Sequence, residues 1–253
     1  MNYLSERNPH PLDESIEFKE YGHIYTIDGD NNYMSVTKWN HSHFPPFETD
    51  KIINGMMKKE YKPGDKYYGM SACEIKEMWQ KNGEASSALG TKLHYDIECY
   101  YNKEPRKNDT IEYEYFMRFA EDHKEMEAFR TEWMIWDKKL KLAGSIDMVF
   151  RNNDGTYSIY DWKRSKGIIT TSSFYVFANT NCISHLPDTN YWHYSLQLHT
   201  YKFLLEKNYG IIIKDLYLIC LHPDNKNGNY QKIKVADLKD EVNELLTLRL
   251  NSL

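Results

Sequence analysis

Short apolar and polar segments alternate along the first part of the chain. Residues 16–27 alternate loosely between apolar and polar side chains and predict a small hairpin. Ser35 or Thr37 is placed to cap a short helix that ends before Pro45 and Pro46. This part of the chain therefore predicts a hairpin followed by short helical segments.

Helical spacing dominates the part that follows. Residues 48–59 predict a short helix, and a longer helix starts at Ser71 and reaches about Tyr101. We expect that helix to bend or break near Gly83, because glycine weakens a helix interior. Residues 110–129 predict the next helix, since their apolar positions recur at helical period.

The hydrophobic period then changes from that of a helix to that of a strand. Asn153, Asp154 and Gly155 form a typical hairpin turn between two apolar runs. Residues 167–190 show no clear periodicity, and loops of that length are usually functional or mobile. The predicted strands cover 132–136, 142–150, 156–162, 211–221 and 230–235, and the predicted helices cover 191–208 and the stretch from Leu238.

This order of elements predicts the fold class and the domain organisation. It is typical of a mixed α/β (α+β) fold, with a central mixed β-sheet flanked by helices and a helical N-terminal part. We expect the hairpin and short helices of residues 1–70 to pack on a core formed by residues 71–253. No long linker separates the two parts, so one compact unit is expected.

Composition and charge narrow the functional classes. The 253 residues carry a net charge of −5, with 41% hydrophobic and 27% charged residues, which is typical of a globular protein. No apolar run approaches the roughly 18–20 residues of a membrane helix, and the N-terminal segment lacks the apolar stretch of a signal peptide. The four cysteines form no CxxC pair, which disfavours a disulfide framework and a cysteine-rich zinc site. We therefore expect an intracellular, reducing compartment, cytoplasmic or nuclear, with neither secretion nor membrane association.

Charged residues interrupt two of the predicted strands. Asp147 lies in an otherwise apolar strand, while Asp161 and Lys163 are two residues apart and so share one face of the next strand. The hairpin brings the strands together, so two carboxylates and one ammonium group meet if the register allows. Carboxylates are the ligands of Mg²⁺, which would orient water and stabilise charge on a scissile phosphate beside Lys163. The competing interpretation is an Asp–Lys ion pair on an exposed strand face.

Five segments, in order along the chain, resemble the motifs of a known family. GSIDMV at residues 144–149 and YDWK at residues 160–163 resemble the core of the PD-(D/E)xK nuclease superfamily, and more specifically its RecB-like branch. Residues 90–98 are similar to the GTxxHxxIE helix motif of that branch, and residues 197–201 to its QxxxY motif. SVT at residues 35–37 resembles a segment of mitochondrial-exonuclease-like and viral or phage exonuclease members.

The resemblance implies a restriction-endonuclease-like core and a role for individual residues. Asp147 and Asp161 would be metal ligands, with His94 as a further ligand or a metal-proximal residue. Lys163 would be the catalytic lysine. Glu132 matches an acidic position that is frequent among relatives and would belong to the catalytic set.

Basic residues near the second motif indicate a surface that faces phosphate. Residues 131–166 hold seven basic and five acidic side chains, a net +2 against −7 for the rest of the chain. Arg164 and Lys166 are therefore candidates for substrate binding, together with Gln197 and Tyr201, which the resemblance would place against the phosphate backbone. The alternatives are a strand edge protected by lysines and the ordinary packing of an amphipathic helix.

Together these features predict a Mg²⁺- or Mn²⁺-dependent deoxyribonuclease that uses one or two ions. The motifs favour an exonuclease or end-processing enzyme of replication, recombination or repair that acts on single- or double-stranded DNA. The alternatives are an endonuclease that cuts DNA or RNA, and a non-catalytic nucleic-acid-binding module on the same fold. Some relatives hold an iron–sulfur cluster, but no cysteine follows Cys220 here, so none is expected.

Overall fold

The computed structural model describes residues 2–253 and divides into two compact units. The first unit comprises the chain up to Pro45 together with Leu93–Leu253, and the second is Pro46–Lys92. The division between residues 1–70 and 71–253 that the sequence indicates has a different boundary and stays a prediction. No helix in residues 2–253 combines the length and the apolar character needed to cross a bilayer.

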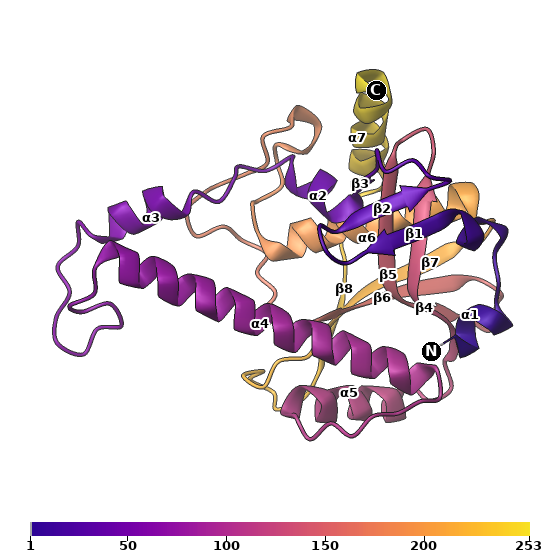
Figure 1. Cartoon of the computed structure of the whole chain (residues 1–253), viewed down its shortest axis with the longest axis horizontal. Coiled ribbons are helices and arrows are strands. Elements are labelled where there is room, and N and C mark those ends of the chain that lie inside the picture. The colour runs from indigo at the N-terminus through magenta and orange to yellow at the C-terminus, as the bar shows by residue number, and fades with distance from the viewer. Residues whose placement is uncertain (1) are drawn as a thin grey trace. The chain divides into compact units, whose positions relative to one another are not determined.

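A six-stranded mixed sheet forms the centre of the first unit (Figure 1). Its strand order is β3-β5-β6-β7-β8, and β4 lies antiparallel along β5. The β3–β5 and β6–β7 pairs are parallel, and the others are antiparallel. This confirms the predicted mixed sheet. The strands are β3 (Met34–Ser35), β4 (Glu127–Asp137), β5 (Leu142–Arg151), β6 (Tyr157–Lys163), β7 (Ile213–Cys220) and β8 (Gln231–Lys234).

One edge of β5 is only partly paired. β4 occupies the other edge from end to end, so β3 and β6 must share the remaining one. There, β3 pairs with Leu142 and Ala143, and β6 pairs with Met148–Arg151. The segment Gly144–Asp147 lies between them and pairs with neither strand. The sheet therefore has an opening along β5 that contains the GSID motif.

Helices cover both faces of this sheet, as the sequence predicts. Val149 and Ile159 pack into one core cluster with α2, α6 and α7, while their neighbours Phe150 and Tyr160 pack into another with α5 and the end of α4. Because successive strand residues point to opposite faces, the two clusters lie on opposite sides of the sheet. The helices are α1 (Tyr3–Arg7), α2 (Val36–His41), α3 (Thr49–Met56), α4 (Ala72–Tyr101), α5 (Ile111–Asp122), α6 (Asn190–Asn208) and α7 (Lys239–Ser252).

The N-terminal hairpin and cap follow their sequence signals. Strands β1 (Ile16–Lys19) and β2 (Ile24–Ile27) form the predicted antiparallel hairpin. Ser35 caps α2, since its hydroxyl accepts a hydrogen bond from Lys38 N–H at 3.1 Å. A third core cluster joins this hairpin to β4 and β5. With α1, α2 and α3, the predicted helical N-terminal part is confirmed.

Two predicted features are wrong. Helix α4 runs without a break through Gly83, because open space surrounds that residue and the strong helix formers Glu84 and Ala85 follow it. Helix α5 ends at Asp122 instead of continuing to residue 129, and the ring of His123 bonds back to a carbonyl at the helix end. The apolar residues that follow belong to β4, where they face the sheet core.

The second unit contains α3, the part of α4 up to Lys92 and the loop that joins them. The Lys76 ammonium donates to Asp50 of α3 at 2.6 Å. Trp79 Nε1 donates to the Tyr67 hydroxyl at 3.2 Å, and its ring faces that of Phe47 with centroids 6.4 Å apart. These contacts fold the loop against α4 within this unit.

The contact between Gly144 of β5 and Tyr201 of α6 gives a test of the packing. A Cβ at Gly144 would lie 2.7 Å from Cε1 of Tyr201 in α6. Gly144→Ala should therefore lower the free energy of unfolding in urea by about 1–3 kcal/mol, the usual range for overpacking. The matched control is Gly83→Ala, where the new Cβ meets nothing within 4 Å and alanine favours the helix. Equal stability of both variants would show that the ring does not pack on β5.

Candidate metal centre

The candidate centre lies where β5 and β6 separate. Their paired region ends at Met148 and Tyr160. Beyond it, Trp162 N–H donates to Asp147 Oδ2 at 2.8 Å, and Trp162 C=O accepts from His94 Nε2 at 2.9 Å. These two bonds satisfy the backbone groups that a longer ladder would have paired. The backbone of one residue therefore positions two candidate site residues.

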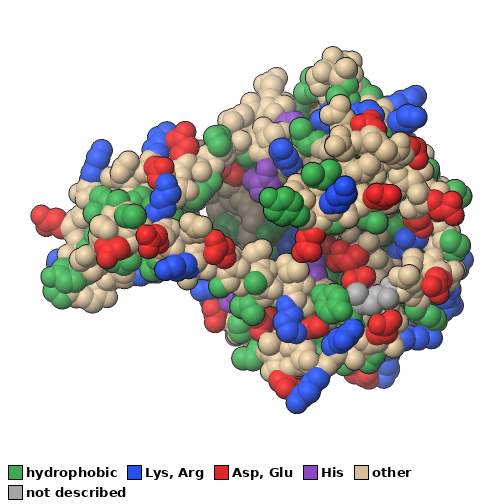
Figure 2. Space-filling model, viewed as in Figure 1, with side chains coloured by type: hydrophobic (Ala, Val, Ile, Leu, Met, Phe, Trp, Pro, Cys, Tyr) green, Lys and Arg blue, Asp and Glu red, His purple; other side chains and the backbone are tan. Residues whose placement is uncertain are grey.

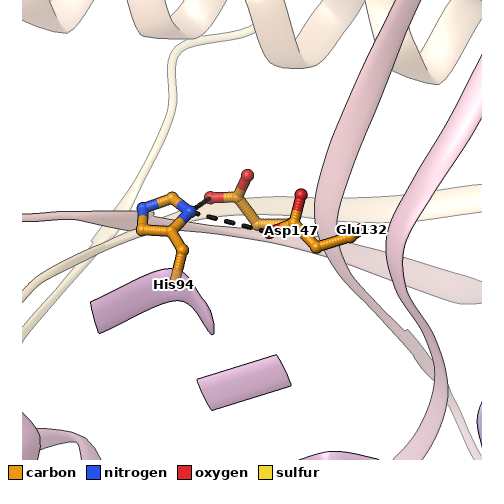
Figure 3. A group of neighbouring side chains, drawn as sticks. All are labelled: His94, Glu132 and Asp147. Carbon is orange, nitrogen blue, oxygen red and sulfur yellow. Dashed lines mark ion pairs between the residues drawn. The ribbon is translucent and has the colours of Figure 1, made fainter. Parts of the chain in front are cut away.

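His94 projects from α4 toward two carboxylates (Figure 3). Its Nδ1 atom lies 3.5 Å from Asp147 Oδ2 and 3.7 Å from Glu132 Oε1. Because Nε2 donates to the Trp162 carbonyl, Nδ1 is the nitrogen that faces the carboxylates. Metal-binding histidines typically donate their second N–H to a carbonyl or carboxylate in this way.

Glu132 stands opposite Asp147 on the neighbouring strand β4. Its φ angle of 42° lies in the left-handed region, which is costly for a residue with a side chain and is typical of functional sites. Ser145 Oγ donates to Glu132 Oε2 at 3.0 Å and fixes the carboxylate. His94, Glu132 and Asp147 each bring one ligand atom to within 4.8 Å of the others.

Asp161 and Lys163 form a buried ion pair on β6. Asp161 Oδ2 lies 2.5 Å from Lys163 Nζ, and their side chains are 3% and 17% exposed. Lys163 Nζ also lies 4.6 Å from the ring centroid of Tyr194 in α6, a cation–π distance. The pair therefore faces α6, while His94 approaches the opening from α4.

Burial and crowded charge shift the pKa values of these groups. Burial raises the pKa of Asp147, and it raises the pKa of Asp161 to about 6. Burial alone would lower the pKa of His94, but Asp147 and Glu132 outweigh it and raise that pKa to about 9. Burial likewise opposes the charge on Lys163, but Asp161 and Asp147 raise its pKa above the ordinary value. Among residues 2–253, the carboxylates of Asp147, Asp161 and Glu132 thus face two cationic side chains, His94 and Lys163.

This donor set fits a divalent metal ion. His94, Glu132 and Asp147 supply one nitrogen and carboxylate oxygens within reach of one ion. A cation would offset the unbalanced negative charge and take the place of the proton on His94 Nδ1. Oxygen donors are those that Mg²⁺ and Mn²⁺ prefer, and the imidazole also suits transition metals. The cluster can therefore hold a metal. Acidic and histidine side chains lie side by side on the viewed face of the molecule (Figure 2).

Gln197 and Tyr201 lie on the face of α6 that meets β5. Tyr201 is 2% exposed, and its hydroxyl accepts a hydrogen bond from Gln197 Nε2 at 3.1 Å. Burial raises the pKa of Tyr201 well above its ordinary value, and the nearby Asp147 and Asp161 add to this. Tyr201 is thus part of the core beside the centre, and Gln197 is half-buried next to it.

Arg164 and Lys166 lie outside the cluster. Arg164 Nε is 2.6 Å from Glu112 Oε1 of α5, in an ion pair whose side chains are 13% and 9% exposed. Lys166 is exposed, with Nζ 3.8 Å from Asp224. The contacts of Arg164 are those of a residue that ties β6 to α5, and Lys166 remains accessible to solvent.

Two residues outside the predicted set of site residues also contribute to this site. Tyr194 shares a helix face with Gln197 and Tyr201, at spacings of three and seven residues, and this periodicity was the available signal. Trp162 contributes through its backbone, and its side chain belongs to the core cluster with α5. No side-chain pattern indicates a role of that kind.

Comparisons with known proteins give only distant likenesses. No family model and no curated protein matches the chain. A solved structure of a protein named "Putative exonuclease" from Eubacterium rectale is 13% identical, with a TM-score of 0.45 over 87% of this chain and 78% of that one. The structure of a protein named SSO0001 is 14% identical, with a TM-score of 0.35 over 88% of this chain and 77% of that one.

Metal binding at the cluster can be tested by thermal unfolding. Mn²⁺ at about a hundred times its dissociation constant should stabilise the protein by about 2.7 kcal/mol. Asp147→Asn should remove that stabilisation. The metal-free variant should be at least as stable as the wild type, because a crowded carboxylate is gone. Asp215→Asn, which changes a surface ion pair with Lys234, is the control and should keep the full shift. An unchanged shift in Asp147→Asn would place the metal elsewhere.

The Arg164–Glu112 ion pair makes a separate prediction about stability. Arg164→Met should lower the free energy of unfolding by about 3–5 kcal/mol, because Glu112 keeps a buried charge without its partner. The double variant Arg164→Met, Glu112→Gln should recover most of that loss in the same urea titration. Additive losses would mean that the two side chains do not interact in solution.

Proposed function

We propose that this protein is a metal-dependent nuclease of the PD-(D/E)xK superfamily that hydrolyses phosphodiester bonds in DNA. One observation carries the proposal. Asp147, Asp161, Lys163, His94 and Glu132 come from three strands and a helix, yet all gather at the segment of β5 that pairs with neither β3 nor β6. An ion pair on an exposed strand face would not bury Asp161, and it would not need a gap in the pairing of β5.

Each residue has a role that its contacts support. His94, Glu132 and Asp147 would hold the metal ion, with Asp161 next to them on β6. The bound ion would supply Lewis-acid stabilisation of charge on the phosphate and lower the pKa of water. Trp162 fixes the orientation of two of these ligands through its backbone.

Lys163 acts as a cation rather than as a base. Its pKa is raised by Asp161 and Asp147, so the ammonium keeps its proton at neutral pH. Asp161 at 2.5 Å and the Tyr194 ring at 4.6 Å hold the ammonium in place. A fixed positive charge beside the scissile phosphate stabilises the negative charge that develops in the transition state. Gln197 would contact the phosphate backbone from α6, and Tyr201 would position it.

Exonuclease or end-processing activity is the form we favour, in agreement with the motifs at residues 90–98 and 197–201. An endonuclease acting on DNA or RNA uses the same chemistry and differs only in how the strand reaches the centre. A non-catalytic binding module is the second candidate. The buried Asp161–Lys163 pair argues against it, because burying both charges costs stability without helping to bind a strand.

A cleavage assay tests the proposal. The protein is incubated with 5′- and 3′-labelled single- and double-stranded DNA and with labelled RNA, in Mg²⁺, Mn²⁺ or EDTA. We expect metal-dependent cleavage that Lys163→Ala slows by at least about 10²- to 10³-fold, since it removes a charge used in the transition state. Tyr201→Phe should lower turnover less, because it removes only the hydrogen bond to Gln197.

The matched control is Lys226→Ala, an exposed lysine in the β7–β8 loop. It should cut at the wild-type rate. The ladders from the two labelled ends distinguish an exonuclease from an endonuclease and give its polarity. Binding of DNA without cleavage under every metal would favour the binding module, and wild-type rates in Lys163→Ala would refute the site assignment.

A further inference from the structure

One cavity of the first unit is lined by basic side chains. It has a volume of about 830 Å³ and opens between the β1–β2 turn, residues 31–35, the β4–β5 turn and α7. Lys38, Lys139, Lys141 and Arg249 line it, and no aspartate or glutamate does. In a chain of net charge −5, such a concentration of positive charge calls for a physical explanation. We call this cavity the basic pocket.

Much of this charge forms no ion pair among residues 2–253. Lys141 Nζ pairs with Asp30 at 2.6 Å. Lys38, Lys139 and Arg249 form no ion pair among residues 2–253. Unpaired cations that converge from three elements repel one another, and an anion in the pocket would relieve that repulsion.

Arg249 is held in place by the backbone of the β4–β5 turn. Its Nε atom donates to the Leu140 carbonyl at 2.5 Å, and its Nη2 atom donates to the Lys141 carbonyl at 3.0 Å. Both acceptors are neutral carbonyls, so they do not neutralise the positive charge of the guanidinium. They do restrict its conformation. A fixed guanidinium is preorganised for phosphate oxygens.

The pocket lies beside β5, the strand that carries Asp147 of the candidate metal centre. Ser35 lines the pocket and pairs with Ala143 of β5, and Asp147 follows Ala143 by four positions. Four strand residues span about 13 Å at ~3.3 Å per residue. Phosphates of one strand advance by ~3.4 Å in a duplex and further when the strand is stretched, so a strand crossing the centre reaches the pocket within about four nucleotides.

We propose that the basic pocket binds phosphate groups of the nucleic-acid strand outside the reacting position. This inference rests on the proposed function and adds a second contact point for the substrate. It implies that strands too short to span from the centre to the pocket bind weakly. Longer strands gain affinity that depends steeply on salt, since each phosphate contact releases counterions.

The alternative explanation is protection of a sheet edge. β3 is a short edge strand, and lysines beside such an edge discourage pairing with another chain. That explanation predicts self-association when the lysines are removed, and no change in nucleic-acid binding. The two explanations therefore differ in what the same variant does.

The test is binding without cleavage. Fluorescence anisotropy in EDTA measures the affinity of the whole protein for two labelled single strands, one too short to reach the pocket and one several times longer. The double variant Lys38→Ala, Lys139→Ala should weaken binding of the long strand about tenfold and reduce the log–log salt slope by about 1.4, since each contact with a single strand contributes ~0.7. The short strand should bind as it does to the wild type.

The control is Lys226→Ala, Lys239→Ala, which removes the same charge from two exposed lysines outside the basic pocket. An unchanged affinity and salt slope in the Lys38, Lys139 variant would overturn the proposal. Self-association of that variant would then support the edge explanation. Loss of inorganic tripolyphosphate binding with the long strand unaffected would also overturn it, in favour of a free polyphosphate.

The cleavage and binding assays distinguish failure of the proposed nuclease function from failure of the pocket proposal. If the wild type cuts no nucleic acid with any metal, yet the Lys38, Lys139 variant loses long-strand affinity, the pocket contact stands without the nuclease. If the wild type cuts and the variant binds like the wild type, the nuclease stands without the pocket.

Discussion

The unpaired edge of β5 between Gly144 and Asp147 is the constraint on which the site depends. Backbone groups inside a protein need partners, so a gap in a ladder persists only when other groups supply them. Here the side chains of Asp147 and His94 take over the backbone groups of Trp162. The ring of Tyr201 fills the remaining space against Gly144, where a larger residue has no room. The same contacts that close the sheet therefore assemble the candidate centre.

The charged groups of the candidate centre lower the stability of the folded state. Asp161 is buried, Asp147 is half-buried and Glu132 adopts a left-handed backbone conformation. Among residues 2–253, the cationic side chains that face these three carboxylates are His94 and Lys163. Burial of unbalanced charge opposes folding, and so does backbone strain. Proteins accept such local conflicts mainly where function requires them. The remainder of the first unit, with apolar clusters on both sheet faces, is where stability is gained.

Sequence patterns predicted the sheet, most helices and the shared strand face of Asp161 and Lys163, because each depends on local periodicity. A spacing of two residues on a strand is enough to put both side chains on one face. The failures have equally local causes. Gly83 predicted a break in the helix, but the helix-forming residues around it keep α4 continuous. Phe129 fits the apolar spacing of the preceding helix, although it belongs to β4. Which partner holds Arg164 depends on how α5 packs on β6, and no sequence period encodes that contact.

The part played by Trp162 has a consequence for how the centre can be studied. Its N–H and C=O groups hold Asp147 and His94, whereas its indole is an ordinary member of the core. Replacing the side chain would report on packing alone, because every amino acid except proline carries the same two backbone groups. Side-chain substitutions therefore cannot reveal the role of Trp162 in these two hydrogen bonds. Only chemistry that alters the main chain itself, such as an ester in place of this amide, would remove the donor and leave the core intact.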